Sequence, residues 1–451
     1  MSSIWWIRRD LRLRDNLTLQ KALENPPVLP VFILDPKLLG NAPERRQNFL
    51  FQNLYKLDED LRSRGAKLIL RCGMPVEVLE SLLQETGAEI IYAEEDFTPY
   101  DRLRSVLVGG SLPLKLIQGQ LGIHPLAGLK ANGEPYRIYT PFKKNWLSHR
   151  PTIELTDPPE RIPSFQDIES EPLPPISEER LLIAGEEAAH SKLFEFLDEK
   201  IKDYHLARDR MDLEGTSLLS PYIHFGVLGL RTAMHYAEKK IAEARKDGMI
   251  GPETWMNELI WREFYIHILY HFPKVRTQNF REQYDRIRWL NREEEFEAWK
   301  DGLTGYPVVD AGMRQLKETG WMHNRARMIT ASFLVKDLLI DWRWGEKWFR
   351  ETLLDGDLAA NNGGWQWVAG TGTDAAPYFR IFNPVLQSRK FDPDGMYIRT
   401  WVPELSEVDD KSIHAPWEKE LDVAGYPKPI VDHKFARERT LIAYDQSRNS
   451  T

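Results

Sequence analysis

The stretch VLPVFIL, from Val28 to Leu34, is the longest of five short apolar runs in the first 123 residues. An uninterrupted apolar run of this length is typical of a buried strand in a parallel sheet. The other four runs are also predicted to be strands: Ile4–Ile7, Lys67–Leu70, Ile90–Ala93 and Leu114–Ile117. Amphipathic stretches at 45–63 and 75–86 are predicted to be helices, and Pro75 suits a helix start. This alternation predicts a doubly wound parallel α/β sheet.

The rest of the chain divides into a linker and a helical half. Ten of the 29 prolines fall between Pro125 and Pro175, among polar and acidic residues, which indicates a long surface connection. Its aromatic and basic part, YRIYTPFKKNW (Tyr136–Trp146), is expected to dock on the protein. From about residue 186 onward the apolar residues recur with a helical period. We predict an α/β domain over 1–123, an interdomain linker over 124–185 and a large all-α domain over 186–451.

The composition excludes several classes of protein. The 451 residues are 42% hydrophobic and 28% charged, which is ordinary for a globular protein of two or three domains. No apolar run approaches the roughly 18 residues of a membrane span. Charged residues follow Arg8-Arg9, where an export signal would need apolar ones. We therefore expect an intracellular, cytoplasmic protein with no membrane partner.

Metal binding is not expected. The single cysteine, Cys72, rules out an internal disulfide and any site held by several cysteines. His267 and His271 are four residues apart, but the H-E-x-x-H motif of zinc enzymes is absent. Aromatic packing is therefore their predicted role.

The net charge of −8 is unevenly distributed along the chain. Residues 153–200 hold 13 acidic and 4 basic residues, a local net charge of −9, so the remainder sums to +1. A basic groove for nucleic acid is therefore allowed outside this segment. A solvated acidic linker on a near-neutral body fits the same distribution equally well.

The stretch WMNELIWREFY, Trp255–Tyr265, contains a first candidate site. On a helix, Glu258, Trp261, Arg262 and Tyr265 would share one face. An indole plane beside a carboxylate suits a flat heterocycle, because the ring can stack on Trp261 while Glu258 bonds its polar edge. A solvated helix edge with a Glu258–Arg262 ion pair explains this stretch equally well.

A second candidate lies in GWMHNRARMITASFLVKDLL, residues 320–339. Asn324, Arg327 and Met328 lie on one side of the predicted helix. If Arg325 and Arg327 are buried, they need phosphate or carboxylate partners. Taken alone, two solvated arginines are the simpler interpretation.

The segment EGTSLLSPYIHFG, residues 214–226, predicts a helix N-terminus rich in hydroxyl groups. Free N–H groups at such an end suit a phosphate. Every capped helix has a similar pattern, so the segment alone does not decide between a binding site and an ordinary helix start.

The most unusual string is GDLAANNGGWQW, residues 356–367. Its glycines and asparagines predict a poor helix and a poor strand. Trp365 and Trp367 should point in different directions, since two helical residues span roughly 200°. Bare backbone would let a planar ligand come close, and Asn361 or Asn362 could offer an amide to a ring nitrogen. A glycine-bent core loop with packed indoles is the alternative.

Three longer stretches resemble the photolyase/cryptochrome flavoprotein family: ELIWREFY, TGYPVVDAGMRQLKETGWMHNRARMITASFLVKDLLIDW and LDGDLAANNGGWQWVAGTGTDAAPYFRIFNP. The resemblance starts at WIRRDLRLRDN (Trp6–Asn16), covers nearly the whole chain, and points to the bacterial class I photolyases of cyclobutane pyrimidine dimers (CPDs). It implies a DNA repair lyase: FADH⁻, excited by near-UV or blue light, gives an electron to a dimer flipped out of UV-damaged DNA, and the cyclobutane ring opens.

The resemblance also implies roles for single residues. Those expected to hold FAD are Tyr204, Thr216, Ser217, Leu218, Leu219, Ser220, Trp255, Arg327, Asp355, Gly356, Asp357 and Asn361. Those expected to line the catalytic dimer pocket are Glu258, Trp261, Asn324, Met328 and Trp367. Those expected to carry electrons to the flavin are Trp289, Trp342 and Trp365. Those expected to contact DNA are Arg208, Glu258, Trp261, Arg262, Asn324, Arg325 and Gln387. Asn361 matches the asparagine that faces flavin N5, and Arg327 is expected to pair with Asp355.

Two positions depart from the family pattern. Leu218 stands where the pattern TSRLS has a basic residue, although backbone contacts to the FAD phosphates would survive that change. DFTPYDRLR, Asp96–Arg104, has Tyr100-Asp101 in place of the Asn-Glu pair associated with a folate antenna. An 8-hydroxydeazaflavin antenna, a methenyltetrahydrofolate antenna and no antenna all stay open.

Two other functions are compatible with the same family. A cryptochrome photoreceptor without repair activity is disfavoured by Asn361 and by the short stretch after Tyr444. A (6-4) photolyase is disfavoured by Met328 in HNRARM, where those enzymes are expected to have histidines. The expected protein is a monomer that acts on UV-damaged DNA.

Overall fold

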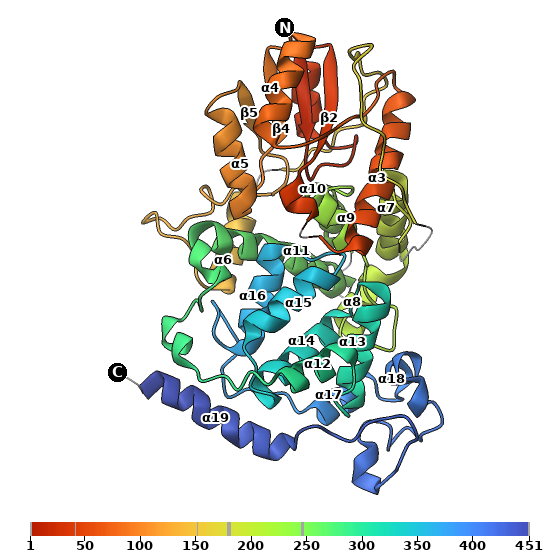
Figure 1. Cartoon of the computed structure of the whole chain (residues 1–451), viewed down its shortest axis with the longest axis vertical. Coiled ribbons are helices and arrows are strands. Elements are labelled where there is room, and N and C mark those ends of the chain that lie inside the picture. Colours follow the sequence, from red (N-terminus) through yellow and green to blue (C-terminus); the bar gives the residue numbers. More distant parts are fainter. Residues whose placement is uncertain (1, 41, 151, 178–181, 245–247, 450–451) are drawn as a thin grey trace. The chain divides into compact units, whose positions relative to one another are not determined.

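The computed structural model describes residues 2–40, 42–150, 152–177, 182–244 and 248–449, which form two compact units (Figure 1). Unit 1 comprises Met1–Tyr136, Thr140–Lys202 and Ser217–His271. Unit 2 comprises Arg137–Tyr139, Asp203–Thr216 and Phe272–Thr451. The domain boundaries predicted at residues 123 and 185 stay a prediction.

Unit 1 contains the predicted parallel sheet, with strand order β3-β2-β1-β4-β5. The strands are β1 (Ser3–Ile7), β2 (Val28–Leu34), β3 (Ile69–Cys72), β4 (Ile90–Glu94) and β5 (Leu114–Ile117). β1 and β2 are buried along their whole length, as their uninterrupted apolar sequences predict. β3 begins two residues later than predicted, because Leu68 N donates to Asp58 Oδ1 at the preceding helix instead of joining the sheet.

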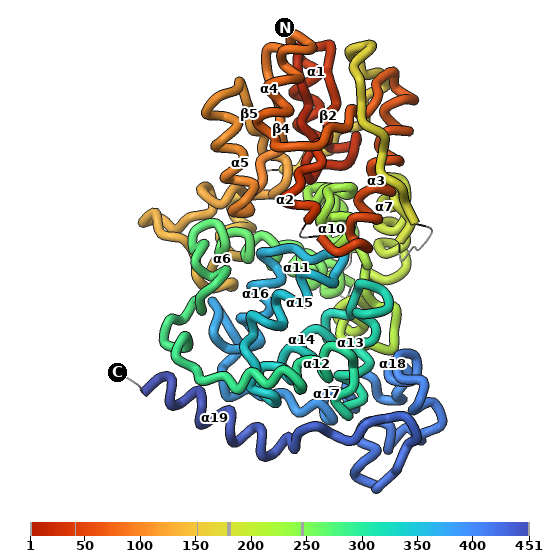
Figure 2. The backbone as a smooth tube through the Cα atoms, viewed as in Figure 1, coloured from red at the N-terminus to blue at the C-terminus, as the bar shows by residue number. Residues whose placement is uncertain are grey.

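The helices that lie wholly or mainly in unit 1 can be followed in Figure 2. They are α1 (Leu17–Leu23), α2 (Pro36–Leu39), α3 (Glu44–Arg62), α4 (Pro75–Thr86), α5 (Pro99–Gly109), α6 (Tyr139–His149), α7 (Glu186–Glu195), the π-helix η1 (Phe196–Lys200), α9 (Ser220–Phe225), α10 (Leu230–Glu243) and α11 (Ile250–His271). α3 and α4 correspond to the two predicted helices, and α4 has its proline in the first turn.

The aromatic segment of the predicted linker is docked in unit 1, as expected. Phe142 and Trp146 of α6 are buried. The Phe142 ring lies 5.3 Å from that of Phe264 in α11, and Trp146 Nε1 donates to Glu263 Oε2 at 2.6 Å. These contacts attach α6 to α11.

Unit 2 is helical, and the described residues beyond 186 contain no strand, as the helical period predicts. Its longer helices are α12 (Glu293–Asp301), α13 (Pro307–Thr319), α14 (Asn324–Ser332), α15 (Trp342–Thr352), α16 (Leu358–Ala369), α17 (Pro384–Phe391), α18 (Met396–Trp401) and α19 (His433–Asn449). Unit 2 also contains α8 (Tyr204–Ala207), which follows η2 (Ile201–Asp203) at the point where the chain passes from unit 1 to unit 2. Its other short turns of helix are η4 (Pro273–Arg276), η5 (Glu282–Arg286), the π-helix η6 (Phe333–Asp337), η7 (Pro403–Leu405) and η8 (Pro416–Lys419).

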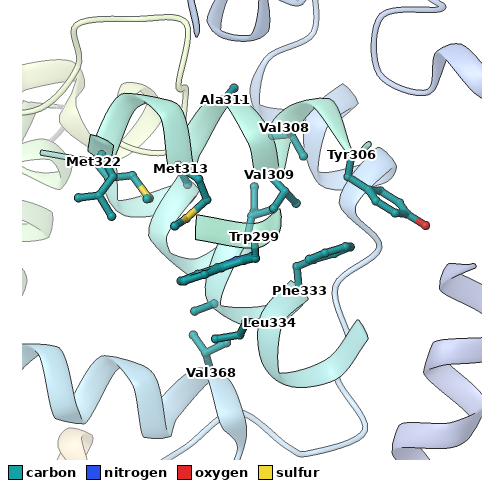
Figure 3. Close-up of a cluster of buried hydrophobic side chains, with 14 of the residues drawn as sticks. Trp299, Tyr306, Val308, Val309, Ala311, Met313, Met322, Phe333, Leu334 and Val368 are labelled. Carbon is teal, nitrogen blue, oxygen red and sulfur yellow. The ribbon is translucent and has the colours of Figure 1, made fainter. Parts of the chain in front are cut away.

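Trp299 of α12 lies among the buried side chains of unit 2 (Figure 3). Its ring stacks on Phe296 and Phe349 with interplanar angles of 15° and 14°, and it meets Trp365 edge-on. Its Nε1 donates to Thr330 O at 3.0 Å, so the only polar atom of the side chain is bonded. This indole therefore joins α12, α14, α15 and α16 into one core.

Two glycines in the same left-handed conformation predict very different costs of substitution. Gly226 ends α9 with φ +67°, and an added Cβ would lie 1.6 Å from Arg9 O. Gly87 ends α4 with φ +66°, and an added Cβ would meet nothing within 4 Å. Gly87→Ala should therefore lower stability by only about 1 kcal/mol, the cost of left-handed backbone. Gly226→Ala should lower the melting temperature much further, because the chain after β1 must move.

Thermal unfolding of the two variants beside the parent protein measures this difference. Equal melting temperatures for Gly226→Ala and Gly87→Ala would show that the close approach of the Arg9 backbone to α9 is wrong.

Candidate active site

The predicted face of α11 is present in unit 1. Glu258, Trp261, Arg262 and Tyr265 are all half-buried, whereas their neighbours on the opposite side of the helix are buried. The rings of Trp261 and Tyr265 are 5.5 Å apart at 34°, and Trp261 meets Phe264 edge-on. The face therefore offers a flat, accessible indole close to a carboxylate and a guanidinium along one line of the helix.

The opposite side of α11 is held by a buried carboxylate that the sequence did not single out. Glu263 Oε1 accepts from Gly122 N at 2.5 Å, and its Oε2 accepts from Trp146 Nε1 at 2.6 Å. Burial raises the pKa of this carboxyl to about 7, although the N–H donors favour its charged form. Glu263 lies two residues after Trp261, so its contacts set the rotation of α11 that leaves Trp261 accessible.

The arginines of α14 have carboxylate partners in unit 2. Arg325 Nη2 lies 2.8 Å from Asp209 Oδ1, and Arg327 Nη2 lies 3.0 Å from Asp355 Oδ2. Arg327 Nε also donates to Met322 O at 2.8 Å. The ion pair predicted between Arg327 and Asp355 is confirmed, and the simpler interpretation of two solvated arginines is wrong.

The other two predicted residues of α14 lie together. Asn324 is exposed and Met328 is half-buried, and Asn324 Nδ2 lies 4.0 Å from Met328 Sδ. His323 accepts from Arg325 N at 3.1 Å and so caps the helix directly before them. A polar amide and a polarizable thioether are thereby presented on successive turns of α14.

The string GDLAANNGGWQW forms most of α16, so the prediction of a poor helix was wrong. Asp357 caps the helix, since its Oδ1 accepts from Ala359 N and Ala360 N at 3.1 Å each. Gly370 ends it in the left-handed conformation. The glycines lower intrinsic helix propensity, but packing of Trp365 in the core outweighs that deficit.

α16 has one buried face and one half-buried face. Trp365 is buried against Phe349 and Trp299, while Trp367 is half-buried, so the two indoles point apart as predicted. Asn361 and Gly364 share the half-buried face with Trp367. A Cβ added at Gly364 would meet nothing within 4 Å, so there is open space beside this part of the helix.

The amide of Asn361 is held in one orientation. Its Nδ2 donates to the backbone O of Glu346 at 2.9 Å and to Glu346 Oε1 at 3.0 Å. The amide orientation follows from these two acceptors. Both hydrogen bonds use the nitrogen, so Oδ1 is the atom that Asn361 can offer to a ligand.

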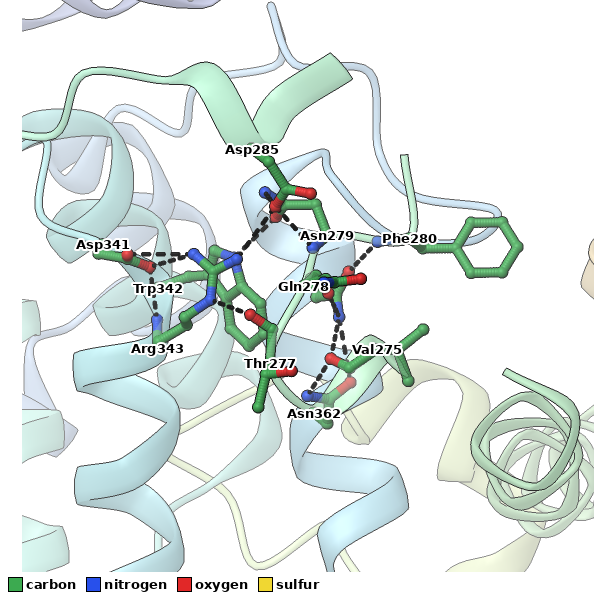
Figure 4. Close-up of polar contacts among 11 residues, drawn as sticks. Val275, Thr277, Gln278, Asn279, Phe280, Asp285, Asp341, Trp342, Arg343 and Asn362 are labelled. Carbon is green, nitrogen blue, oxygen red and sulfur yellow. Dashed lines mark hydrogen bonds and ion pairs between the residues drawn. The ribbon is translucent and has the colours of Figure 1, made fainter. Parts of the chain in front are cut away.

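Polar contacts also fix the buried side of α16 and the first residue of α15 (Figure 4). Asn362 Nδ2 and Gln366 Nε2 both donate to Val275 O, at 3.0 and 2.9 Å. Trp342 Nε1 donates to Asn279 Oδ1 at 2.8 Å. The segment that follows α11 in sequence thus holds both helices in place.

The three tryptophans predicted to carry electrons differ in burial. Trp342 and Trp365 are buried, and Trp289 is half-buried. Among the described residues, no ring contact pairs two of these three indoles. Trp365 Nε1 is buried without a hydrogen-bond partner in the described part of the chain, whereas Trp342 Nε1 is bonded.

The remaining predicted residues are divided between the two units. Tyr204, Arg208 and Thr216 belong to unit 2, where the Arg208 guanidinium lies 5.7 Å from the Tyr204 ring. In unit 1, Trp255 is buried with its ring 5.0 Å from that of Phe196. The predicted N-terminus of a hydroxyl-rich helix is confirmed, since α9 begins at Ser220 after Ser217, Leu218 and Leu219. Gln387 is half-buried on α17, and Gly356 is buried beside Asp355 and Asp357.

Leu218, which departs from the family pattern, has a left-handed backbone with φ +54°. This conformation is uncommon for a residue with a branched side chain and turns the loop directly before α9. The loop therefore has a special backbone shape whatever the side chain at this position.

The residues of the antenna motif bond to one another. Tyr100 Oη donates to Asp35 Oδ2 at 2.7 Å, and Arg104 forms an ion pair with Asp101. Asp96, Asp101 and Arg104 of the motif are all buried. The contacts explain why Tyr100-Asp101 is compatible with the fold, and they leave the choice of antenna open.

The two histidines of α11 contact aromatic rings. His267 lies 5.1 Å from Phe142 and 4.5 Å from His271, and it accepts from Tyr136 N at 3.1 Å. Burial lowers the pKa of His267 to about 3, so its imidazole is neutral. Within the ranges that the structure describes, no three His, Cys, Asp or Glu side chains are grouped as a metal site, and no helix is long and apolar enough to cross a membrane.

Most of the helical C-terminal part matches a known protein family. Residues 255–446 match the family described as the FAD binding domain of DNA photolyase, so the chain has a FAD-binding domain. Residues 3–164 match the family described as DNA photolyase. The deoxyribodipyrimidine photo-lyase of Agrobacterium fabrum is 40% identical over 99% of this chain and 98% of its own length. The chain therefore belongs to the DNA photolyase family.

Solved structures agree with this membership. A bacterial class III photolyase from Agrobacterium tumefaciens is similar with a TM-score of 0.92 and 39% identity, over 100% of this chain and 98% of that one. The cryptochrome of Synechocystis sp. PCC6803 has a TM-score of 0.88 and 28% identity, over 98% of this chain and 99% of that one. The α/β plus all-α fold predicted from the sequence is thus confirmed.

The geometry around α16 fits a flavin. The open space beside Gly364 lies on the same helix face as Asn361, whose amide oxygen can accept a hydrogen bond. Asp355 lies shortly before α16 in sequence and forms an ion pair with Arg327, so the two charges neutralise each other. A planar ring could thus approach bare backbone while one fixed amide bonds its edge.

Glu263 predicts a pH dependence of stability. Its pKa is raised to about 7 in the folded protein from 4.5. A carboxyl with a raised folded pKa stabilises the fold below its unfolded pKa and loses that contribution as the pH rises through its folded pKa. We expect the free energy of unfolding of the parent to fall relative to Glu263→Gln between about pH 5 and 7, by at most about 3 kcal/mol.

Urea unfolding of both proteins at several pH values tests this expectation. Glu263→Gln should be less stable than a protein with an intact acceptor pair, because an amide offers fewer acceptors to the N–H groups around it. The test is therefore how the difference in the free energy of unfolding between the two proteins changes with pH. Parallel curves across this pH range would mean that Glu263 is charged in the fold.

Proposed function

We propose that this protein is a deoxyribodipyrimidine photo-lyase, a carbon–carbon lyase that uses light to split CPDs in DNA. The observation that carries the proposal is the end-to-end similarity to an enzyme of that name. The accessible indole and carboxylate of α11 support it, because a pair of fused pyrimidines needs both a flat surface and polar partners.

Each side chain expected to meet the dimer has a distinct task. Trp261 and Trp367 provide flat surfaces for the extruded bases. Glu258 accepts hydrogen bonds from base N–H groups, which a carboxylate can do with two oxygens. Asn324 bonds a base edge, and Met328 fills the adjacent space with an adaptable thioether.

FAD bound in its reduced form supplies an electron to the dimer under near-UV or blue light. The proposed cofactor residues are the set inferred from the resemblance, from Tyr204 and the 216–220 loop to Trp255 and Arg327. Asn361 presents Oδ1 while Glu346 occupies its nitrogen. An aspartate at this position would place a negative charge beside an anionic reduced ring, so a neutral amide suits the task better.

The proposed DNA contacts begin from paired arginines. Arg325 is bonded to Asp209, and Arg208 lies 3.9 Å from the same carboxylate. A DNA phosphate would therefore compete with Asp209 for both guanidinium groups. Arg262 and Gln387 are both half-buried and would add a charged and a neutral contact.

The sequence resemblance favours class I, while a class III photolyase is among the similar structures, so the class stays a prediction. A cryptochrome function is the second candidate, because a cryptochrome shares the fold; Asn361 speaks against it. A monomeric protein in the cytoplasm, where bacterial DNA lies, is the expected state.

Light dependence is the main test of the proposal. Purified protein with reduced FAD should convert thymine dimers to thymines in single-stranded and duplex DNA under blue light and leave them intact in the dark. Chromatography of digested DNA measures the loss of dimers. Protein that holds reduced flavin and removes no dimers in the light would refute the photo-lyase and favour the photoreceptor.

Glu258→Ala tests the pocket itself. The variant should retain flavin but lose about tenfold to a hundredfold in kcat/KM for repair, since a hydrogen bond to a charged group contributes about 1.5–3 kcal/mol. Glu258→Gln, which keeps the size and one acceptor, should lose less. If Glu258→Ala instead releases FAD, as shown by the absorption spectrum, the residue serves the cofactor and the assignment is wrong.

A further inference from the structure

A carboxylate lies between the two arginines of unit 2 that are expected to contact DNA. Asp209 is in the turn that follows α8, and its Oδ1 lies 2.8 Å from Arg325 Nη2 and 3.9 Å from Arg208 Nε. The Asp209 side chain is 34% exposed, against 15% for Arg325 and 23% for Arg208. The carboxylate is therefore the most accessible of the three groups, and it takes the place in which a phosphate would find two guanidinium partners.

The guanidinium of Arg325 has a support other than Asp209. Its central carbon lies 4.2 Å from the ring centroid of Phe391, which is buried at the end of α17. The backbone N of Arg325 donates to the ring of His323, so the first turn of α14 is fixed as well. Phe391 thus holds the guanidinium by a cation–π contact while Nη2 is bonded to Asp209. Loss of the Asp209 charge would leave the arginine in place and more strongly attractive to an anion.

A phosphate that binds these guanidinium groups has to displace the carboxylate. The two anions cannot share the same N–H groups, because negative charges in contact repel each other. Asp209 lies in a turn and is a third exposed, so its side chain can rotate into water when a phosphate arrives. Because the carboxylate stays attached to the same chain, it returns at a high effective concentration when the phosphate moves away. This competition weakens the phosphate contacts and leaves the dimer pocket unchanged.

We propose that Asp209 is an internal competitor of the DNA phosphates for Arg325 and Arg208, and that it speeds the release of DNA. The inference rests on the proposed function, in which both arginines contact DNA. A dimer held in the pocket adds contacts that resist release. Once the dimer is split and its bases return to the duplex, the phosphate contacts are what remains. Recapture of the arginines by Asp209 then promotes dissociation of the repaired DNA.

Dissociation of DNA from the full-length flavoprotein in the dark tests the inference. Stopped-flow fluorescence anisotropy follows labelled duplexes, with and without one thymine dimer, after excess unlabelled DNA is added. Asp209→Asn keeps the size of the side chain and removes its charge, so both duplexes should dissociate about threefold to tenfold more slowly than from the parent. Asp209→Glu keeps a carboxylate and should restore most of the parent rate.

The salt dependence of DNA affinity separates competition from a structural effect. In the parent, the displaced carboxylate collects a cation from solution, which offsets part of the cations released from the DNA. That offset is absent in Asp209→Asn, so the slope of the logarithm of the binding constant against the logarithm of the salt concentration should become steeper by up to about one. A variant that only altered the shape of the turn would not release more cations.

Asp212→Asn is the matched control. Asp212 lies in the same connection between α8 and α9, where its Oδ1 accepts from Arg210 Nε at 2.7 Å. Arg210 is not among the residues expected to contact DNA, so removal of this charge should leave the dissociation rate and the salt slope close to those of the parent. In an Arg325→Ala background, Asp209→Asn should slow dissociation less than in the parent, because the closer partner of the carboxylate is gone.

Four outcomes would overturn the inference. Unchanged dissociation and salt slope in Asp209→Asn would show that phosphates do not compete with this carboxylate. Weaker binding by Asp209→Asn would show that Asp209 orients the arginines for DNA. An equal gain from Asp212→Asn would assign the effect to the general charge of the segment, and a parent that binds neither duplex would exclude any competition. Failure of the proposed function is distinguishable, because it is a lack of dimer loss in the light, whereas DNA release is measured in the dark and needs no repair.

Discussion

The close packing of α16 against α15 is the constraint on which the candidate site in unit 2 depends. A Cβ at Gly345 would lie 2.1 Å from the Trp365 ring and 2.6 Å from Leu334. The glycine therefore lets the indole reach the core, and the next residue, Glu346, lies within hydrogen-bond distance of Asn361. With a larger residue at 345 the helices would separate, and the amide of Asn361 would lose both acceptors.

The same packing gives the two faces of α16 different roles. The buried face, with Trp365, contributes apolar area to the core around Trp299. The glycine-rich face contributes no side chain at Gly364 and leaves open space there. α16 forms despite its low intrinsic helix propensity because tertiary contacts stabilise it. The glycines lack side chains, so a ligand can approach the backbone of the helix closely.

Buried charge orients the helices more than it stabilises them. A paired buried ion recovers most of its desolvation cost only with good geometry, so such pairs are weak evidence for stability. Glu263 illustrates the point, since its N–H donors specify how α11 is rotated while its burial raises its pKa to about 7. Arg327 similarly ties the first turn of α14 to Asp355, just before α16. The accessible groups of α11 and α14 owe their directions to these contacts.

Periodicity in the sequence was enough to determine the strands, the parallel sheet, the helical second half and the shared face of Glu258 and Trp261, because these depend on local spacing and on which residues avoid water. It was not enough for α16, whose glycines and asparagines argue against a helix, nor for Glu263 and Glu346, which look like ordinary surface acids. Only the tertiary structure decided these, because the partner of each lies on another element. Glu263 bonds to Trp146, Glu346 bonds to Asn361, and the Trp365 ring packs where Gly345 has no side chain. Hydrogen bonds and close packing between distant segments leave no periodic pattern in the chain, whereas burial of one helix face does.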